Sequence, residues 1–470
     1  MVRKELDETN TDKAAKENFG CAMKKTCDSE RNLPRRSLLK AAAAVVGFPY
    51  FIRPSALGKD GGAAPSERVT IGHIGVGNRG GSLLGSFLQL PDARSVAVCD
   101  AKTDMLEAAI QRVDSHYGGK SCRAYGDFRQ LLERGDIDAV VVATPDHWHV
   151  PVAVAAAKAG KDMYVEKPLG ISVEQDQALR KEILRRRLVF QYGTQQRSGR
   201  DFRLACRIAR SGRLGKIHTI HAWCNRGERG GSAVPEPVPD NINYDMWLGP
   251  APYRPYSSDR CGGIDARKGV YHISDYALGF IAGWGAHPLD IAQWGNDTEL
   301  TAPVEYEGSG EFPNEGLFDT AVQWDVTCRY AKKVVMRFMS QDVAQPVVSR
   351  YRKFHRHGTT FLGEAGWVSV DRAGICADPE RVLREPFGPA EAYLYESTNH
   401  SQNFVDCVKS RRKTASPIEP AVQSDIISHL SEIAIRTGRK IKWDSTTEKI
   451  IGDDNAARML RRAMRKPWGL

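Results

Sequence analysis

The chain has 470 residues, of which 41% are hydrophobic and 26% charged, and its mean hydropathy is −0.43. This length exceeds what one hydrophobic core usually supports, so we expect two folded domains with tails. The formal net charge is +10, but no RNP motif, zinc-finger spacing or aromatic-interleaved basic stripe accompanies it, and we expect no nucleic-acid partner. The ten cysteines stand singly, which gives no sign of a disulfide framework.

The first 58 residues are typical of an export signal. Arg35 and Arg36 precede the apolar run Ala41–Ile52, and the small-residue stretch Pro54–Gly58 follows shortly after it. This run is shorter than the about 20 residues that cross a bilayer, so we expect no membrane span in the mature chain. The paired arginines resemble a twin-arginine signal. We predict a signal segment at 1–58, a linker at 59–66 and export to the periplasm or another extracytoplasmic space; an uncleaved basic tail is the alternative.

A hydrophobic strand running into a glycine-rich turn opens the folded part of the chain. The motif is Gly75-x-Gly77-x-x-Gly80, and a second apolar run twenty residues later ends on Asp100. Its glycines allow a tight turn, backbone approach to a pyrophosphate and close helix packing, and the following helix N-terminus favours phosphate. Asp100 is placed to bind a ribose 2′-hydroxyl, which favours NAD over NADP. The expected cofactor contacts here are Gly75, Gly77, Asn78, Arg79, Gly80 and Asp100, with solvent exposure as the alternative for Arg79.

Strands and helices alternate through residues 67–193, which predicts a doubly wound parallel sheet. Helices are expected at 103–116, 126–134, 149–159 and 173–187, and strands at 138–143, 162–165 and 188–192. We therefore predict an NAD-binding Rossmann domain over 67–193.

The pattern changes after a helix expected near 200–211. Runs at 216–224, 322–330, 333–338 and 366–370 alternate apolar and polar residues, while 225–269 is irregular. This alternation is typical of an antiparallel sheet with one packed and one free face. Further helices are expected at 290–294, 393–410 and 421–437. The predicted fold class is α/β: the Rossmann domain, then an α+β domain over 194–445 with a large open, mainly antiparallel sheet for substrate binding and homo-oligomer formation, then a basic C-terminal tail at 446–470.

Two further motifs follow predicted strands of the first domain. Thr144-Pro-Asp-His-Trp-His149 follows one strand and Glu166-Lys167-Pro168 follows the next. Since ligands bind outside the carboxyl ends of parallel strands, both motifs share a rim with the glycine loop. Together with Gly193-Thr-Gln-Gln-Arg-Ser198, Gly283-Trp-Gly-Ala-His-Pro-Leu-Asp290 and Gly438-Arg-Lys-x-x-Trp443, they make the chain resemble the Gfo/Idh/MocA oxidoreductases, best in their exported branches.

This resemblance implies roles for particular residues. Lys167 corresponds to the lysine that sits beside the nicotinamide and handles the hydroxyl proton, which suits a partly buried lysine with a lowered pKa. His287 corresponds to an active-site histidine. Many relatives carry an aspartate four residues before it, where this chain has Gly283, and Asp275 or Asp290 are candidate replacements. The further cofactor contacts expected are Thr144, Pro145, Trp148, His149, Glu166, Lys167 and Gln195.

Other polar and aromatic clusters are less specific. His147 and His149 have no matching third and fourth ligand, so we expect no metal site, and His355 and His357 are interpreted as solvated. Aromatic faces beside polar donors suit a sugar or cyclitol, although such residues are often core. The substrate candidates are Trp223, Tyr271, His272, Trp284 and Asp290, near a mouth that also includes Arg226, Arg229, Tyr244 and Trp247.

Three functions remain open from the sequence. The first is an oxidoreductase that transfers hydride between a sugar or cyclitol hydroxyl and a tightly bound nicotinamide cofactor. The second is an NAD-dependent glycoside hydrolase or lyase, which works by transient oxidation, elimination and re-reduction. The third is a noncatalytic protein that holds the cofactor, and the presence of Lys167 argues against it.

Overall fold

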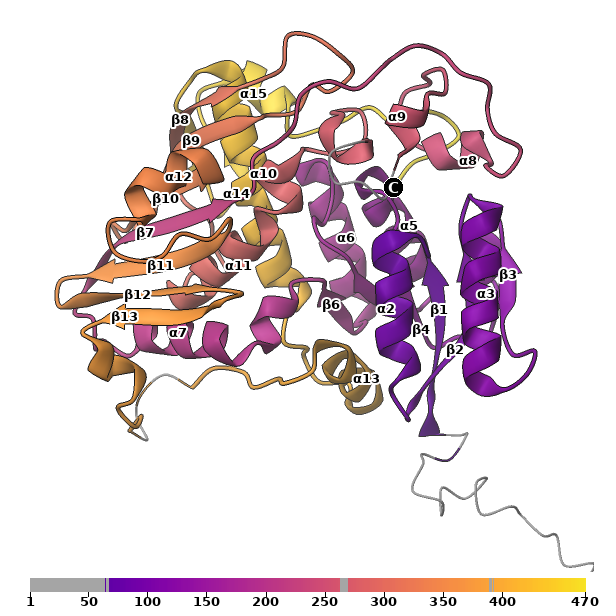
Figure 1. The fold of residues 1–470 in the computed structure, drawn as a ribbon, viewed down its shortest axis with the longest axis horizontal. Coiled ribbons are helices and arrows are strands. Elements are labelled where there is room, and N and C mark those ends of the chain that lie inside the picture. Colours follow the sequence, from indigo (N-terminus) through magenta and orange to yellow (C-terminus); the bar gives the residue numbers. More distant parts are fainter. Residues whose placement is uncertain (1–63, 65–66, 263–268, 389–390, 392) are drawn as a thin grey trace, which may run out of the picture. The chain divides into compact units, whose positions relative to one another are not determined.

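The computed structural model describes residues 64, 67–262, 269–388, 391 and 393–470 (Figure 1). The expected signal segment, and the linker apart from Ala64, lie outside these ranges. No helix within them has both the length and the apolar character that a bilayer span requires.

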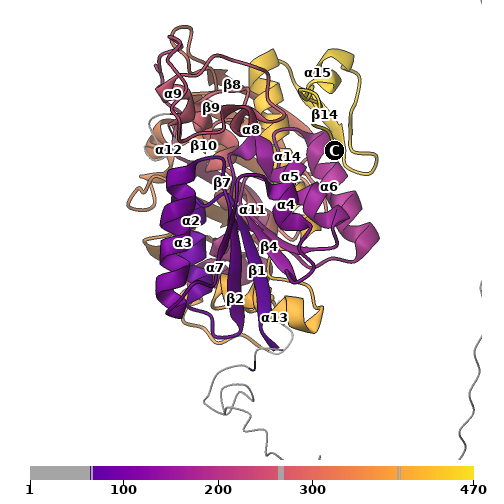
Figure 2. The ribbon, with the colours of Figure 1, turned by 90° about the vertical axis from the view of Figure 1, so that its right-hand side faces the viewer.

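The first domain is built on a six-stranded, fully parallel sheet, as predicted. Its strand order is β3-β2-β1-β4-β5-β6, with the glycine loop following the central strand β1 (Figures 1 and 2). The strands are β1 (Val69–Ile74), β2 (Ala93–Cys99), β3 (Arg123–Tyr125), β4 (Ala139–Val142), β5 (Asp162–Val165) and β6 (Phe190–Tyr192). Because every strand points the same way, the ends of β1, β2, β4 and β5 meet at one edge of the sheet.

Helices α2 (Asn78–Leu88), α3 (Thr103–Tyr117), α4 (Phe128–Leu132), α5 (Asp146–Lys158) and α6 (Val173–Arg186) accompany this sheet. Helix α6 begins where the Ser172 side chain accepts a hydrogen bond from the Gln175 amide. Helix α5 begins three residues before its predicted start, directly after Pro145, so its first turn contains most of the motif at 144–149. No side chain caps α2, whose N-cap position is Gly77. Its first amides are therefore left to a ligand or to water.

The second domain carries a nine-stranded sheet of order β13-β12-β11-β7-β10-β9-β8-β14-β15. All neighbours are antiparallel except β7 and β10, which are parallel. The strands are β7 (Ile217–Cys224), β8 (Glu305–Glu311), β9 (Gln323–Arg329), β10 (Val335–Ser340), β11 (Gly358–Gly363), β12 (Gly366–Asp371), β13 (Gly374–Asp378), β14 (Ile441–Asp444) and β15 (Lys449–Ile450). The mainly antiparallel sheet was expected. Strands β8, β11, β13, β14 and β15 were not predicted, and in β8 the signal is weak because, of its residues, only Tyr306 is buried.

Helices pack unequally on the two faces of this sheet. On one face lie α7 (Arg200–Arg210), α11 (Ala286–Gly295) and α14 (Ile418–Thr437), which contact β12, β11 and β8 respectively (Figure 1). Alternate residues of β9, namely Trp324, Val326 and Cys328, are buried, whereas the residues between them are only half-buried. Helix α12 (Gln341–Val348) packs with Trp223 and Met339 in a separate small apolar cluster.

The two domains share their cores across the predicted boundary at residue 193. Helix α13 (His400–Ser410) belongs to the second domain by sequence, yet its Phe404 packs edge-on against Phe87 and Tyr164 of the first. Helix α14 also contacts α6. This shared packing holds the rim of the parallel sheet against the second domain.

The C-terminal residues 446–470 fold back onto the chain. They contain β15 and α15 (Asp454–Arg458), and the Trp468 ring packs edge-on against Trp148 at 4.7 Å between centroids. The Arg465 Nε donates to the carbonyl oxygen of Gly249 at 2.9 Å. The basic tail therefore supports the outer side of α5.

Candidate active site

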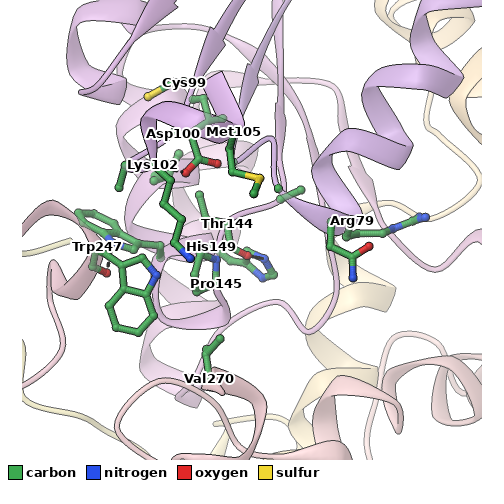
Figure 3. A pocket seen from close by; sticks show the side chains of 18 of the residues that line it. Arg79, Cys99, Asp100, Lys102, Met105, Thr144, Pro145, His149, Trp247 and Val270 are labelled. Carbon is green, nitrogen blue, oxygen red and sulfur yellow. Dashed lines mark hydrogen bonds between the residues drawn. The ribbon is translucent and has the colours of Figure 1, made fainter. Parts of the chain in front are cut away.

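A cavity of about 480 Å³ lies at the carboxyl-end edge of the parallel sheet. It extends from the ends of β1 and β2, across the loop after β4, to Lys167 after β5. In Figure 3 Asp100 and Met105 lie on one side of this cavity, and Trp247 and Val270 lie on the opposite side. Predicted cofactor contacts that line it are Gly75, Gly77, Asn78, Arg79, Asp100, Thr144, Pro145, Trp148, His149, Glu166 and Lys167.

The glycine loop has the geometry that a dinucleotide requires. Gly75 has φ +81, and a Cβ there would lie 2.6 Å from the Ala143 backbone. A Cβ at Gly80 would lie 1.9 Å from the Gly75 carbonyl oxygen, so this glycine lets α2 approach β1. Nothing lies within 4 Å of a Cβ built on Gly77, which borders the cavity. The uncapped α2 terminus and this open space suit a pyrophosphate.

Asp100 is held at the end of β2 by two backbone amides. Its carboxylate accepts hydrogen bonds from Val76 N at 2.9 Å and from Lys102 N at 3.0 Å. Burial raises the pKa of Asp100, although these amides oppose the effect. The carboxylate thus couples the glycine loop to the cavity wall on which a cofactor ribose would lie.

The opposite wall comes from the irregular stretch of the second domain. Thr103 N donates to Asn241 O at 2.9 Å, and Asn243 N donates to Ala101 O at 2.8 Å. The Lys102 amine reaches Cys261 O at 3.2 Å. These bonds fasten the chain at 241–261 across the end of the cavity nearest Asp100.

Lys167 connects the cavity to the second domain. Its Nζ donates to the Gly283 carbonyl oxygen at 2.6 Å. Burial lowers the pKa of Lys167, and nearby Glu166 and Asp146 oppose that shift. Glu166 is itself held by Arg79, whose Nε donates to it at 2.7 Å. The Lys167 amine is therefore fixed in position while its protonated form is made less stable.

His287 lies near this amine, since both groups adjoin the Trp284 ring. It is 3% exposed, at the start of α11, and its ring centroid is 6.1 Å from that of Trp284. Burial lowers its pKa well below the usual value, and the charges of Lys167 and Arg372 act in the same direction. A neutral imidazole can donate or accept a hydrogen bond, which suits contact with a substrate hydroxyl.

Two of the substrate candidates, Trp223 and His272, were predicted wrongly. Each is 0% exposed, so neither can touch a substrate. Trp223 packs beside Phe354 and donates its Nε1 proton to His355 O, and His272 packs against Phe280 and Phe318. Both occupy core positions, the alternative that the aromatic pattern had left open. Tyr271 does line the cavity.

Two further predicted contacts act through other residues. Asp290 is fully buried and forms two 2.7 Å hydrogen bonds with the Arg197 guanidinium, so it is no proton relay for His287. Gln195 lies outside the cavity lining and donates to Glu166 at 2.8 Å, which positions that carboxylate. Asp275 also lies outside that lining and pairs with Arg254.

The two motif histidines each lie within hydrogen-bond distance of backbone carbonyl oxygens. The His147 Nε2 lies 3.1 Å from Trp247 O. The ring nitrogens of His149 lie 2.7 Å from Pro168 O and 2.9 Å from Thr144 O. His149 thereby joins the loops after β4 and β5 beneath the cavity.

Three residues near Lys167 were missed or misread. Asp146 is 2% exposed, its Oδ2 has no hydrogen-bond partner in the described chain, and burial raises its pKa to about 7. It stands inside the motif at 144–149, which was a usable signal. His357 was interpreted as solvated, but its ring lies 5.7 Å from Trp284 and its Nε2 is buried. Arg372, whose Cζ is 5.3 Å from the Trp284 centroid, belongs to no motif.

The whole architecture matches one known family. Residues 69–194 match an oxidoreductase family with an NAD-binding Rossmann fold, and residues 217–347 and 390–470 match the C-terminal alpha/beta domain of that family. The chain belongs to the Gfo/Idh/MocA oxidoreductase family.

Two relatives with similar sequences are named as glycosidases. A glycosyl hydrolase family 109 protein of Saccharopolyspora erythraea is 36% identical over 167 residues, which cover 32% of this chain and 36% of that protein. An alpha-N-acetylgalactosaminidase of Shewanella oneidensis is 34% identical over 163 residues, 31% of this chain and 35% of that protein. The matches thus span about a third of each relative.

Three solved structures share the fold. GenD2 from gentamicin A biosynthesis, in complex with NAD, has a TM-score of 0.58 at 17% identity and covers 82% of this chain and 98% of its own. WlbA from Bordetella pertussis, with NADH and UDP-GlcNAcA, has a TM-score of 0.59 at 16% identity, covering 80% and 98%. The myo-inositol 2-dehydrogenase of Lactobacillus plantarum has a TM-score of 0.53 at 16% identity, covering 80% and 99%.

Proposed function

We propose that this protein is an NAD-dependent oxidoreductase that takes hydride from a hydroxyl-bearing carbon of a sugar or cyclitol. The position of Lys167 carries the proposal. Its side chain borders the same cavity as the glycine loop and Asp100, and its amine is held by Gly283 O at 2.6 Å. A base at this point faces the far end of a dinucleotide whose ribose lies at Asp100.

NAD, when bound, supplies the hydride acceptor. The protein's part is to take the proton: as the C–H bond breaks, the O–H bond also breaks, its proton passes to the neutral Lys167 Nζ, and a C=O bond forms. The lowered pKa of Lys167 increases the neutral fraction near physiological pH. His287 orients the hydroxyl, and the reverse steps return the proton and hydride to a carbonyl substrate.

The test begins with purified protein and identification of any nucleotide released on denaturation. Absorbance at 340 nm is then followed with NAD and a panel of hexoses, sugar acids and inositol isomers. We expect at least one compound to generate NADH, or to oxidise bound NADH when a carbonyl acceptor is added. Binding of NAD without turnover of any member in either direction would contradict the proposal.

A second candidate is glycoside hydrolysis through transient oxidation, which the two glycosidase relatives favour. Oxidation acidifies the C–H next to the new carbonyl, so the leaving group departs by elimination before the ring is reduced again. Incubation with p-nitrophenyl N-acetyl-α-galactosaminide and no added NAD distinguishes the candidates. Release of nitrophenol without net NADH would favour hydrolysis over net oxidation.

We further propose that the protein is exported with its cofactor in place and works as a homo-oligomer. The bonds between 101–103 and 241–243 fasten the chain across the end of the cavity nearest Asp100, which supports slow cofactor release. Cell fractionation, with Arg35→Lys/Arg36→Lys as the matched variant, tests export.

The proposed homo-oligomer is tested by light scattering, which measures the molar mass of the purified protein in solution.

A further inference from the structure

Four ionisable side chains surround the half-buried ring of Trp284. The Lys167 Nζ lies 6.0 Å and the Arg372 Cζ 5.3 Å from the ring centroid. The His287 and His357 rings lie 6.1 Å and 5.7 Å from it. The Trp284 indole therefore lies beside both the proposed base, Lys167, and a second basic side chain, Arg372.

The positive charge around this indole exceeds the available negative charge. Among the described residues Arg372 has no ion-pair partner, and its side chain is exposed in the turn after β12. Glu166 already pairs with Arg79. Asp146, with its pKa raised to about 7, carries only part of a charge at neutral pH. Arg372 thus has no carboxylate of its own to balance its charge.

The space beside the Gly283 Cα is open, and two nearby imidazoles have unused hydrogen-bonding capacity. A Cβ built on Gly283, whose carbonyl holds Lys167, would meet only Phe280 Cδ1, at 3.9 Å. The His287 Nδ1 and the His357 Nε2 have no hydrogen-bond partner in the described chain. Buried polar atoms without partners are costly, so a polar ligand here would supply missing bonds.

Building on the proposed function, we propose that the substrate is an acidic sugar whose carboxylate binds the Arg372 guanidinium beside Trp284. The planar guanidinium matches a carboxylate in two parallel hydrogen bonds and stacks readily on an aromatic ring. An apolar face of the sugar ring packs on the indole, and a ring hydroxyl faces Lys167. A neutral sugar would leave Arg372 unpaired, and a phosphate monoester would bring about −1.5 to −2 charges to this one unpaired guanidinium.

Binding is measured directly by calorimetry on the NAD-loaded protein. The probes are D-glucuronate, D-galacturonate, D-glucose, D-galactose and D-glucose 6-phosphate. We expect at least one sugar acid to bind tenfold or more tightly than its neutral counterpart and than the phosphate. Arg372→Gln should remove that preference while changing neutral-sugar affinity less than twofold.

Arg384→Gln is the matched control, because Arg384 is exposed and pairs with Glu380. It should keep the preference. Equal binding of acids and neutral sugars, tightest binding of the phosphate, or a preference that survives Arg372→Gln would each overturn the inference. Sugar acids that bind through Arg372 but never reduce NAD would contradict only the proposed oxidation. Turnover of neutral sugars unaffected by Arg372→Gln, with no acid preference, would contradict only the substrate class.

Discussion

The amine of Lys167 and the carbonyl oxygen of Gly283 are 2.6 Å apart, which joins the end of β5 to α10 (Phe280–Gly283) of the second domain. This bond uses one N–H of the amine. The lone pair of the neutral amine and its other N–H remain available for a substrate. The bond makes the position of the proposed base depend on how the two domains pack. Many relatives carry an aspartate at position 283. In this chain the backbone carbonyl of Gly283 contacts the lysine amine where an aspartate side chain could do so.

Lys167→Met should reduce turnover by about 10²- to 10⁴-fold, the usual contribution of a general base. The dinucleotide should still bind within a few-fold, because the glycine loop and Asp100 are unchanged. Steady-state kinetics and a nucleotide titration measure the two effects. A variant that retains nearly full turnover would remove Lys167 from the mechanism.

The pH dependence of turnover gives an independent reading of the same residue. Oxidation needs the neutral amine, and burial lowers the pKa of Lys167. Activity in the oxidation direction should therefore rise with pH and reach its plateau below the ordinary lysine pKa of about 10.4. Lys167→Arg, which stays protonated, should abolish this rising limb while preserving the positive charge.

Gly77 and Gly80 should respond oppositely to alanine. At Gly77 the new methyl enters open space beside the cavity, so NAD affinity should fall about tenfold while the unfolding temperature changes little. At Gly80 it meets the Gly75 carbonyl oxygen at 1.9 Å, so the protein should lose about 1–3 kcal/mol of stability. Nucleotide titration and thermal unfolding of both variants make the comparison. The reverse pattern would show that the phosphates lie elsewhere.

Asp100 should determine the choice between the two nicotinamide cofactors. Asp100→Ala removes hydrogen bonds to a ribose and a negative charge near its 2′ position, so NAD affinity should fall about tenfold. NADP affinity should rise, because its phosphate no longer meets a carboxylate. Asp100→Asn is the control: it keeps an acceptor for Val76 N and relieves only the repulsion. Unchanged NAD-to-NADP selectivity in both variants would contradict this role.

Much of this arrangement could be predicted because it depends on short-range patterns. The glycine spacing, the strand ends and the placement of Asp100 are properties of single segments, and the structure shows the glycine loop, Asp100 and Lys167 along one cavity. The parallel sheet followed because its strands are buried on both sides and separated by helices.

The rest depends on contacts between distant residues. Trp223 and Tyr271 are both aromatic residues near the predicted cleft, so the sequence does not distinguish their roles. Trp223 is a core residue because α12 packs against β7 and β10. Arg372 stands in a turn with no motif, and only the pairing of β11, β12 and β13 places it beside Trp284. The helical segment predicted from residue 393 begins at His400, where the Asn399 side chain caps it.

A buried network links α6 to α14 and supports the loop after Lys167. The Asp425 carboxylate accepts from Leu169 N at 3.2 Å, and the His429 Nε2 lies 3.1 Å from Asp176. Burial alone would lower the pKa of His429, but hydrogen bonds to Asp176 and Asp425 outweigh it and raise the pKa to about 9. His429 is therefore charged in the folded protein over a pH range where it is neutral in the unfolded chain.

This shift predicts that stability is lost as the pH rises. The contribution of His429 is fully present below its unfolded pKa of about 6.5 and disappears as the pH passes through about 9. His429→Gln should cost about 3 kcal/mol at pH 6 in urea unfolding, and the difference from the unsubstituted protein should shrink by pH 9.5. His218→Gln, at an exposed histidine of β7, should show no such pH dependence. A penalty for His429→Gln that is constant or grows with pH would mean that this imidazole is neutral in the folded state.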